Sequence, residues 1–301
     1  MAGIVGKRLW FFLMSAVILV VCIISLGVFG LKTGLDFSSG STLTVTFENT
    51  VAVKDIETAL TDLGYTGHVE IDQKGNIVIR TIELTLEQKN KLKEDLIVKF
   101  GALTEKGFES VDPIVAKSTT RTAIIAIIVA SVAMLIYVSW AFRKMPKPFR
   151  YGTCSVVAIV HDVIVVLGIF SILGVIANWE IDLGLVTGVL TVVGYAINDT
   201  IVIFDRIREN VRRYPSTDFE LVVNNSLMET MSRSLITGSG VIFVLIALKL
   251  FVGHAIDSLV VTLLVGILAG TYTSICIAGP LLVSWEKGNW GKLFPQRQAV
   301  K

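Results

Sequence analysis

Ionisable side chains interrupt long apolar stretches of this chain, where such groups are costly and can carry protons. His161 and Asp162 interrupt one apolar stretch, Asn198 and Asp199 interrupt the next, and Arg233 begins a third. Each ionisable group costs about 2.5–3.5 kcal/mol when such a stretch inserts into a bilayer. A carboxylate beside an arginine suits the binding and release of a proton. The sequence therefore predicts a proton relay at Asp199 and Arg233, with a static buried pair that fixes helix register as the alternative.

The positions of Asp199 and Arg233 along their helices favour a contact between them. At about 1.5 Å per residue, Asp199 lies roughly 9 Å from the membrane face where its helix ends, and Arg233 about 3 Å from it. A long arginine side chain bridges that gap, so we expect a partly desolvated ion pair. For His161 and Asp162 two alternatives stay open, a second proton-carrying pair and a structural hydrogen-bonded pair.

The helix that carries Asp199 has other polar residues at about helical spacing, which places them on one side. We expect that side to face the interior of a helix bundle. The polar set is Thr191, Tyr195, Asn198, Asp199 and Asp205. The charged residues where this helix ends are predicted to form salt bridges and to set topology; they are Asp205, Arg206, Arg208 and Glu209.

The composition identifies the class of protein. Hydrophobic residues make up 53% of the 301 residues, charged residues only 17%, and the mean hydropathy is +0.71. Soluble domains contain about 45–50% apolar and ~25% charged residues, so a membrane protein is predicted. The net charge of +2 does not favour a nucleic-acid surface. Cys22, Cys154 and Cys276 lie in apolar runs without metal-binding spacing and are predicted to be packing residues, so we expect neither a metal site nor a cofactor.

Six apolar segments can cross a bilayer, which needs about 20 apolar residues in a helix. They are residues 9–31, 122–142, 151–178, 183–204, 234–248 and 258–285, of which the fifth is the weakest. Lys and Arg gather before the first segment and after the second, fourth and sixth. The positive-inside rule then places both termini in the cytoplasm of a multi-pass protein of the cytoplasmic membrane.

The predicted domains follow from these spans. Residues 1–31 hold the N-terminal segment and the first span, residues 122–285 hold the other five spans, and residues 286–301 form a cytoplasmic tail. Residues 32–121 are predicted to form an external domain.

Hydrophobic periodicity in residues 32–121 predicts an α+β fold. Strands are expected at 41–48, 68–73, 76–82 and 108–115, and helices at 51–63 and 86–100. The order β-α-β-β-α-β is the ferredoxin-like arrangement. The fold class is therefore an α-helical polytopic membrane protein with six transmembrane helices and an external ferredoxin-like α+β domain between the first two. This domain carries no catalytic cluster, which favours contact with a polypeptide or a partner.

The connection between the fourth and fifth spans has a helical pattern of its own. Thr217-Asp218-Phe219-Glu220 fits a capping box, and apolar residues then recur at helical spacing. We expect residues 215–232 to contain an amphipathic helix that lies in the membrane interface.

Several motifs resemble the SecF proteins, protein-export membrane subunits of the SecD/SecF family in the resistance-nodulation-division superfamily. The main motif is VGYAINDTIVIFDRIREN at residues 193–210. Shorter ones are GLDFSSG at 34–40, HD at 161–162, TMSRS at 230–234 and GTYTS at 270–274. The resemblance extends from the first span to the last.

The resemblance implies partners and a function. SecF proteins pair with SecD, work beside the SecYEG channel and use the proton-motive force to help move exported preproteins, and accessory proteins of the YajC and YidC kinds are further expected partners. The family's functional aspartate and arginine fall on Asp199 and Arg233. A family motif follows the first helix, and its residues here are Gly34, Asp36, Phe37 and Gly40. The family usually has two glycines where this chain has Ser39-Gly40, and serine resists a positive φ.

Two hypotheses therefore stand side by side, an energy-coupling half-transporter and a scaffold subunit that moves no protons. No HExxH, GxSxG or Walker-type glycine loop is present, so we do not expect an enzyme. A small-molecule exporter is a more distant alternative.

Overall fold

The computed structural model describes residues 3–49, 51–71, 75–252 and 256–288. The chain divides into two compact units, Thr33–Ile124 and the remainder of the chain on either side of it.

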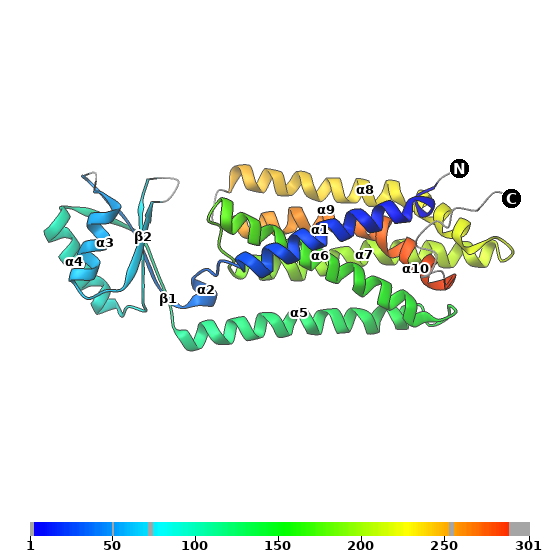
Figure 1. Cartoon of the computed structure of the whole chain (residues 1–301), viewed down its shortest axis with the longest axis horizontal. Helices are drawn as coiled ribbons and strands as arrows, with labels where there is room; N and C mark the ends of the chain where they lie inside the picture. The colour runs from blue at the N-terminus through cyan, green and yellow to red at the C-terminus, as the bar shows by residue number, and fades with distance from the viewer. Residues whose placement is uncertain (1–2, 50, 72–74, 253–255, 289–301) are drawn as a thin grey trace, which may run out of the picture. The chain divides into compact units, whose positions relative to one another are not determined.

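The larger unit is a bundle of six helices long and apolar enough to cross a membrane, as the sequence predicts (Figure 1). They are α1 (Arg8–Phe29), α5 (Pro113–Ala141), α6 (Pro148–Ile176), α7 (Leu183–Arg213), α8 (Phe219–Phe251) and α9 (Asp257–Thr273), which continues through a π-helical turn (Ser274–Ala278) into α10 (Gly279–Glu286). Local signals define several of the ends. Pro148 begins α6, Asp182 caps α7 by accepting from the Leu185 amide at 3.0 Å, and α1 ends at Gly30 with φ 67°.

Ion pairs connect the ends of several helices at the end of the bundle that carries many basic residues. Arg8 at the start of α1 pairs with Glu220 on α8 at 3.0 Å, and Lys287 after α10 pairs with the same glutamate at 2.8 Å. Arg150 on α6 pairs with Glu286 of α10 at 2.5 Å. The starts of α1, α6 and α8 therefore lie at the same end of the bundle, as alternating membrane spans require.

Helix α8 differs from the prediction. The prediction of a separate interfacial helix within residues 215–232 is wrong, because α8 runs without interruption from Phe219 to Phe251. The predicted capping box is also absent, since Asp218 precedes the helix without a side-chain cap. The apolar face of this first part packs in the bundle core, where Val223 and Leu227 are fully buried. Periodicity gives the width of an apolar face and does not distinguish protein from lipid as its neighbour.

Glycines let α7 and α9 approach each other closely. A Cβ atom on Gly266 would lie 2.1 Å from Val192 Cγ2, and one on Gly188 would lie 2.5 Å from Thr262 Cγ2. Both distances are far below a normal contact. This pair of helices is therefore held by backbone proximity, the usual basis of association in a membrane.

We predict that Gly266→Ala destabilises the bundle by about 1–3 kcal/mol, the usual cost of overpacking. Gly194→Ala on α7 is the matched control, because a Cβ there meets nothing within 4 Å and alanine favours a helix. Unfolding of the purified protein in mixed detergent micelles measures both. Equal stability of the two variants would contradict the close approach.

The smaller unit has the predicted β-α-β-β-α-β order. Its elements are β1 (Gly40–Phe47), α3 (Val53–Asp62), β2 (Gly67–Ile71), β3 (Ile77–Thr81), α4 (Leu86–Phe100) and β4 (Leu103–Val111), after a short helix α2 (Leu35–Ser38). The antiparallel sheet has the order β2-β3-β1-β4. Helices α3 and α4 cover one face of it (Figure 1), and Leu43, Ile56 and Leu92 are among the residues of the core between them. The predicted strand end at 72–73 lies outside the described residues.

The last strand lies earlier than predicted. A strand at 108–115 is wrong in its bounds, because β4 ends at Val111 and Pro113 begins α5. Proline fits the first turn of a helix, and Asp112 Oδ1 accepts from the Ile114 amide at 2.6 Å. A bulge opposite Thr44–Val45 interrupts the alternation that would have revealed the start of the strand.

A charged cluster fastens α4 to β4. Glu105 accepts from Lys93 at 2.5 Å and from Lys89 at 3.1 Å. The hydrogen bond from Lys93, together with the second lysine, lowers the pKa of Glu105 below its usual value.

Candidate functional site

Asp199 is buried where α7 meets α8. Its side chain is 6% exposed, and Oδ1 accepts a hydrogen bond from Ser234 Oγ at 3.0 Å. The second oxygen, Oδ2, is buried and has no hydrogen-bond partner among the described residues. A carboxylate oxygen in this position has free capacity to take up a proton.

Arg233 does not pair with Asp199, so the expected ion pair is absent from this structure. Arg233 is exposed, whereas its neighbour Ser234 is buried and reaches the carboxylate. Successive residues on a helix point about 100° apart, so the turn that aims Ser234 at α7 aims Arg233 away. Arg233 lines a cavity of about 380 Å³ that also contains Asp205 and Glu229. Sequence reasoning missed Ser234, although it stands in the TMSRS motif.

The polar stripe of α7 faces the interior only along one edge. Asp199 is buried and Tyr195 is half-buried, but Thr191, Asn198 and Asp205 are exposed. The prediction that the whole stripe points inward is therefore wrong. At about 100° per residue, the five positions span roughly 120° of the helix, with Asp199 at one margin. A stripe of that width straddles the boundary between bundle and surroundings.

His161 and Asp162 form the core of a second buried polar cluster. They are 6% and 1% exposed, and His161 Nδ1 lies 3.3 Å from Asp162 Oδ1. Thr273 donates to Asp162 Oδ2 at 3.0 Å, and Ser15 Oγ lies 2.6 Å from His161 Nε2. The cluster therefore joins α1, α6 and α9.

Hydroxyl groups extend this second cluster toward α7. Ser274 follows Thr273 and begins the π-helical turn, and its Oγ lies 2.9 Å from Thr200 Oγ1. Thr200 is the residue after Asp199. The consecutive residues Thr273 and Ser274 thus contact α6 and α7, respectively. π turns inside α-helices are frequent at functional sites. The GTYTS motif is evident in the sequence, whereas the contacts of its hydroxyl groups are not.

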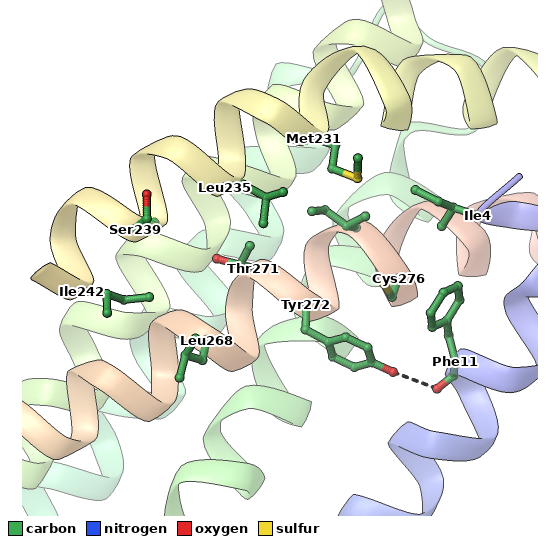
Figure 2. A pocket seen from close by; sticks show the side chains of 12 residues that line it. Ile4, Phe11, Met231, Leu235, Ser239, Ile242, Leu268, Thr271, Tyr272 and Cys276 are labelled. Carbon is green, nitrogen blue, oxygen red and sulfur yellow. Dashed lines mark hydrogen bonds between the residues drawn. The ribbon is translucent and has the colours of Figure 1, made fainter.

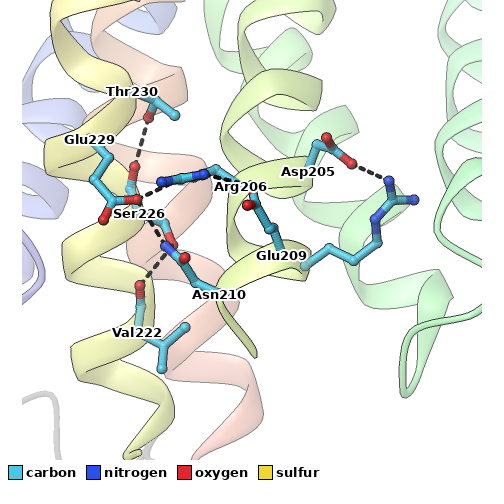
Figure 3. A network of polar contacts seen from close by, with 9 residues as sticks. Asp205, Arg206, Glu209, Asn210, Val222, Ser226, Glu229 and Thr230 are labelled. Carbon is cyan, nitrogen blue, oxygen red and sulfur yellow. Dashed lines mark hydrogen bonds and ion pairs between the residues drawn. The ribbon is translucent and has the colours of Figure 1, made fainter. Parts of the chain in front are cut away.

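At the end of α7, the charged residues form the predicted salt bridges (Figure 3). Arg206 pairs with Glu209 and with Glu229 of α8, both at 2.5 Å, and Arg208 pairs with Asp205. Asn210 adds hydrogen bonds to Glu229 and to Ser226, each at 3.0 Å. The network ties the end of α7 to the first turns of α8.

The motif after α1 builds a turn and not a reactive site. The Gly34 carbonyl accepts from the amides of Phe37 and Ser38 at 3.1 and 3.0 Å and so starts α2, which contains Asp36. Ser39 then has φ 63° and ψ 168°, and Gly40 has φ 117° where β1 begins.

Ser39 adopts a backbone conformation that is essentially reserved for glycine, at a cost of about 1–3 kcal/mol. We predict that Ser39→Gly stabilises the smaller unit by about 1 kcal/mol, after the extra freedom of glycine in the unfolded chain is counted. Hydrogen-exchange mass spectrometry should then show protection of β1 raised about fivefold. Gly40→Ala should lower it, because its Cβ would lie 2.6 Å from the Thr81 carbonyl oxygen. Unchanged exchange in Ser39→Gly would show that the turn is unstrained.

The chain also matches known protein families. Residues 92–288 match the family "Protein export membrane protein SecD/SecF, C-terminal". The chain belongs to the SecD/SecF family. Residues 24–51 match the "SecD/SecF GG Motif", which here reads Ser39-Gly40. Among the described residues of this family member, no three His, Cys, Asp or Glu side chains gather to hold a metal ion.

Relatives within the family include full-length and fused proteins. The chain is 42% identical to the protein translocase subunit SecF of Thermobaculum terrenum, over 98% of this chain and 97% of that protein. It is 32% identical to the protein translocase subunit SecDF of Bacillus subtilis, over 93% of this chain and 38% of that one. The crystal structure of SecDF from Thermus thermophilus, a translocon-associated membrane protein, has a TM-score of 0.81 and 27% identity, and the match covers 94% of this chain and 38% of that one. This chain therefore corresponds to one part of the fused proteins, and is a protein translocase subunit with several membrane spans.

Proposed function

We propose that this chain promotes polypeptide translocation across the cytoplasmic membrane by coupling it to the proton-motive force, together with SecD and the SecYEG channel. The observation that carries the proposal is Asp199, a carboxylate buried in a membrane-spanning bundle with one oxygen that has no partner among the described residues. A charged group in that position is energetically costly, so a carboxylate buried in a membrane bundle usually has a function. Proton binding and release is one such function.

Arg233 supplies the second state of the proposed mechanism. In one state Arg233 stays in the cavity beside Asp205 and Glu229, and Asp199 is available to a proton. In the other state α8 rotates so that Arg233 approaches Asp199 and favours its charged form. Ser234 holds the carboxylate at 3.0 Å and links each change of Asp199 to α8. Asn198, His161 and Asp162 are proposed as further members of the relay or its support.

The exposed polar edge of α7 supports a membrane partner. Thr191, Asn198 and Asp205 would face hydrocarbon or its border if α7 met lipid there, which is unfavourable for an amide and a carboxylate. A second set of helices with its own polar edge would cover them. SecD is the proposed partner, since fused SecDF relatives carry both names in one chain.

The remaining parts of the proposal follow from the sequence. Both termini lie in the cytoplasm, because Lys and Arg gather at the end of the bundle where α1, α6 and α8 start. The smaller unit is external and contacts SecD or the translocating preprotein. The further proposed partners are the lipid bilayer and accessory proteins of the YajC and YidC kinds. We propose no nucleic-acid partner. The tail beyond Gly288 lies outside the described residues. We propose no enzymatic reaction and no cofactor.

Membrane vesicles that contain SecYEG and SecD, with or without this chain, test the proposal. Precursor translocation is measured with the proton gradient intact and with it collapsed by an uncoupler. We expect the chain to add translocation only when the gradient is intact. An equal benefit in the collapsed vesicles would favour a scaffold that stabilises the translocase without moving protons.

A further inference from the structure

A cavity of about 480 Å³ lies between α1, α8 and the helix formed by α9 and its π turn (Figure 2). Ligand pockets for small molecules have volumes of about 300–1,000 Å³. Three helices and the turn before α1 supply its walls, which include Ile4 and Phe11 before and in α1, Leu235 and Ser239 on α8, and Leu268 and Tyr272 on α9.

The hydroxyl groups of Tyr272 and Ser239, which line the cavity, are both already engaged in hydrogen bonds to backbone carbonyl groups. Tyr272 donates its hydroxyl to the Phe11 carbonyl at 2.9 Å, as Figure 2 shows, and Ser239 donates to the Ile236 carbonyl at 2.9 Å. Most of the other lining side chains are apolar, and Thr271 carries a third hydroxyl group. An apolar occupant therefore fits, and a polar solute does not.

The cavity opens sideways from the bundle. Leu235 and Leu268 on its rim are 51% and 58% exposed, whereas Gly238 and Ile275 at its base are buried. All four residues belong to helices that cross the membrane. The medium at the opening is therefore the acyl region of the bilayer.

A positive charge lies beside the end of the cavity formed by α1. Lys7 is one turn after Ile4 and one turn before Phe11, so it shares the face of both lining residues. It is exposed and makes no ion pair within the described part of the chain. The other charges nearby neutralise one another, since Arg8 and Lys287 pair with Glu220, and Lys287 also pairs with Asp218. Within the described residues, Lys7 is therefore a cation without an ion pair at membrane-surface level.

We propose that this cavity binds one acyl chain of an anionic phospholipid, with the head group beside Lys7. An acyl chain gains no hydrophobic free energy by leaving the bilayer for an apolar cavity, so packing contacts and the head group must decide the affinity. An acyl chain that fills the cavity makes van der Waals contacts with wall side chains that would otherwise have no neighbouring atoms on that side. Selectivity for an anionic head group follows from Lys7, since one basic residue near the surface contributes about fivefold in binding. The proposal does not depend on proton coupling.

Photocrosslinking tests the site in the complete chain together with its SecD partner. The complex is placed in phosphatidylcholine vesicles that contain a small fraction of phosphatidylglycerol with a diazirine on its acyl chain. We expect crosslinks in peptides that contain Leu235, Ser239 or Leu268. Lys7→Gln should lower the yield about fivefold. Ser239→Phe, which fills the cavity, should lower the yield as well.

Matched variants separate a specific site from general exposure to lipid. Ile236→Phe places the same aromatic ring on α8 at a position that is 68% exposed and does not line the cavity. Lys144→Gln removes an exposed cation between α5 and α6. Both should leave the yield unchanged.

Three results would overturn the proposal. A diazirine phosphatidylcholine that crosslinks equally well would indicate ordinary contact with surrounding lipid. Crosslinking that survives both Ser239→Phe and Lys7→Gln would place the reactive lipid outside the cavity. Crosslinks to a SecD helix from a photoreactive amino acid placed at Leu235 or Leu268 would show that protein and not lipid covers the cavity.

Discussion

Replacing Asp199 with asparagine is expected to abolish the gradient-dependent part of translocation while the chain remains assembled in the membrane. Asparagine keeps the size of the side chain, and its carbonyl oxygen can still accept from Ser234, which lies 3.0 Å from Oδ1 in this structure. What it loses is the capacity to bind and release a proton. The variant therefore removes the chemistry and keeps the contact.

The size of the expected loss follows from the energy of the gradient. One charge that moves through 100 mV supplies about 2.3 kcal/mol. That free energy changes an equilibrium constant about 50-fold, since 1.36 kcal/mol is a factor of ten. Such a bias is large enough to shift a two-state bundle whose states differ by a few kcal/mol. Without a titratable group at position 199, the proton gradient cannot supply this free energy to the bundle.

Asp218→Asn is the matched control for this prediction. Asp218 immediately precedes α8, is exposed and pairs with Lys287 at 3.0 Å. The control removes the same chemical group at a level where water replaces the lost contact. We expect translocation in inverted vesicles to keep its full dependence on the gradient. If Asp199→Asn also keeps it, the relay is wrong and the scaffold is the better description.

Arg233 and Ser234 show how far the sequence could define the site. Inserted charges are rare, so Asp199 was evident from its type and its place within an apolar stretch. Which of two neighbouring side chains reaches it depends on the rotation of α8, and one residue changes that direction by about 100°. Nothing local to the sequence sets this rotation. It follows from the packing of Val223 and Leu227 in the bundle core, earlier in the same helix.

The fold was more predictable than the site because it depends on length and period. Apolar runs long enough for a bilayer identified six spans, and alternation with helical spacing identified the β-α-β-β-α-β order. Both signals are averaged over many residues. The bounds of β4 and the continuity of α8 depend on single features, the bulge near Gly107 and the neighbour of one apolar face. The π turn at Ser274 has no sequence signal that we recognise.

Thr273→Val is expected to destabilise the bundle by about 2–3 kcal/mol when Asp162 is present, and by about 1 kcal/mol in the Asp162→Asn background. Thr273 Oγ1 lies 3.0 Å from Asp162 Oδ2 and 3.2 Å from the Gly270 carbonyl oxygen, and His161 Nδ1 lies 3.3 Å from Asp162 Oδ1. The larger cost is expected if Thr273 donates to a charged Asp162 carboxylate. Hydrogen bonds to a charged group contribute about 1.5–3 kcal/mol and those to a neutral group about 0.5–1.5 kcal/mol.

Thr187→Val is the matched control for the hydroxyl group. Thr187 is exposed on α7, and its hydroxyl donates to the Leu183 carbonyl of its own helix at 2.9 Å. Its replacement should change stability by less than about 0.5 kcal/mol. Unfolding of the purified protein by SDS in mixed micelles measures the four members of the cycle and the control.

The same cycle separates the two roles left open for His161 and Asp162. A cost of Thr273→Val that is equal in both backgrounds would show that Asp162 contacts Thr273 as a neutral group, contrary to our expectation. If the cycle shows a charged contact and Asp162→Asn retains gradient-dependent translocation, Asp162 fixes the register of α6 against α9. If Asp162→Asn loses that dependence without loss of assembly, the turn at Thr273 and Ser274 connects a second proton site to α7, because Thr273 contacts Asp162 and the next residue, Ser274, contacts Thr200.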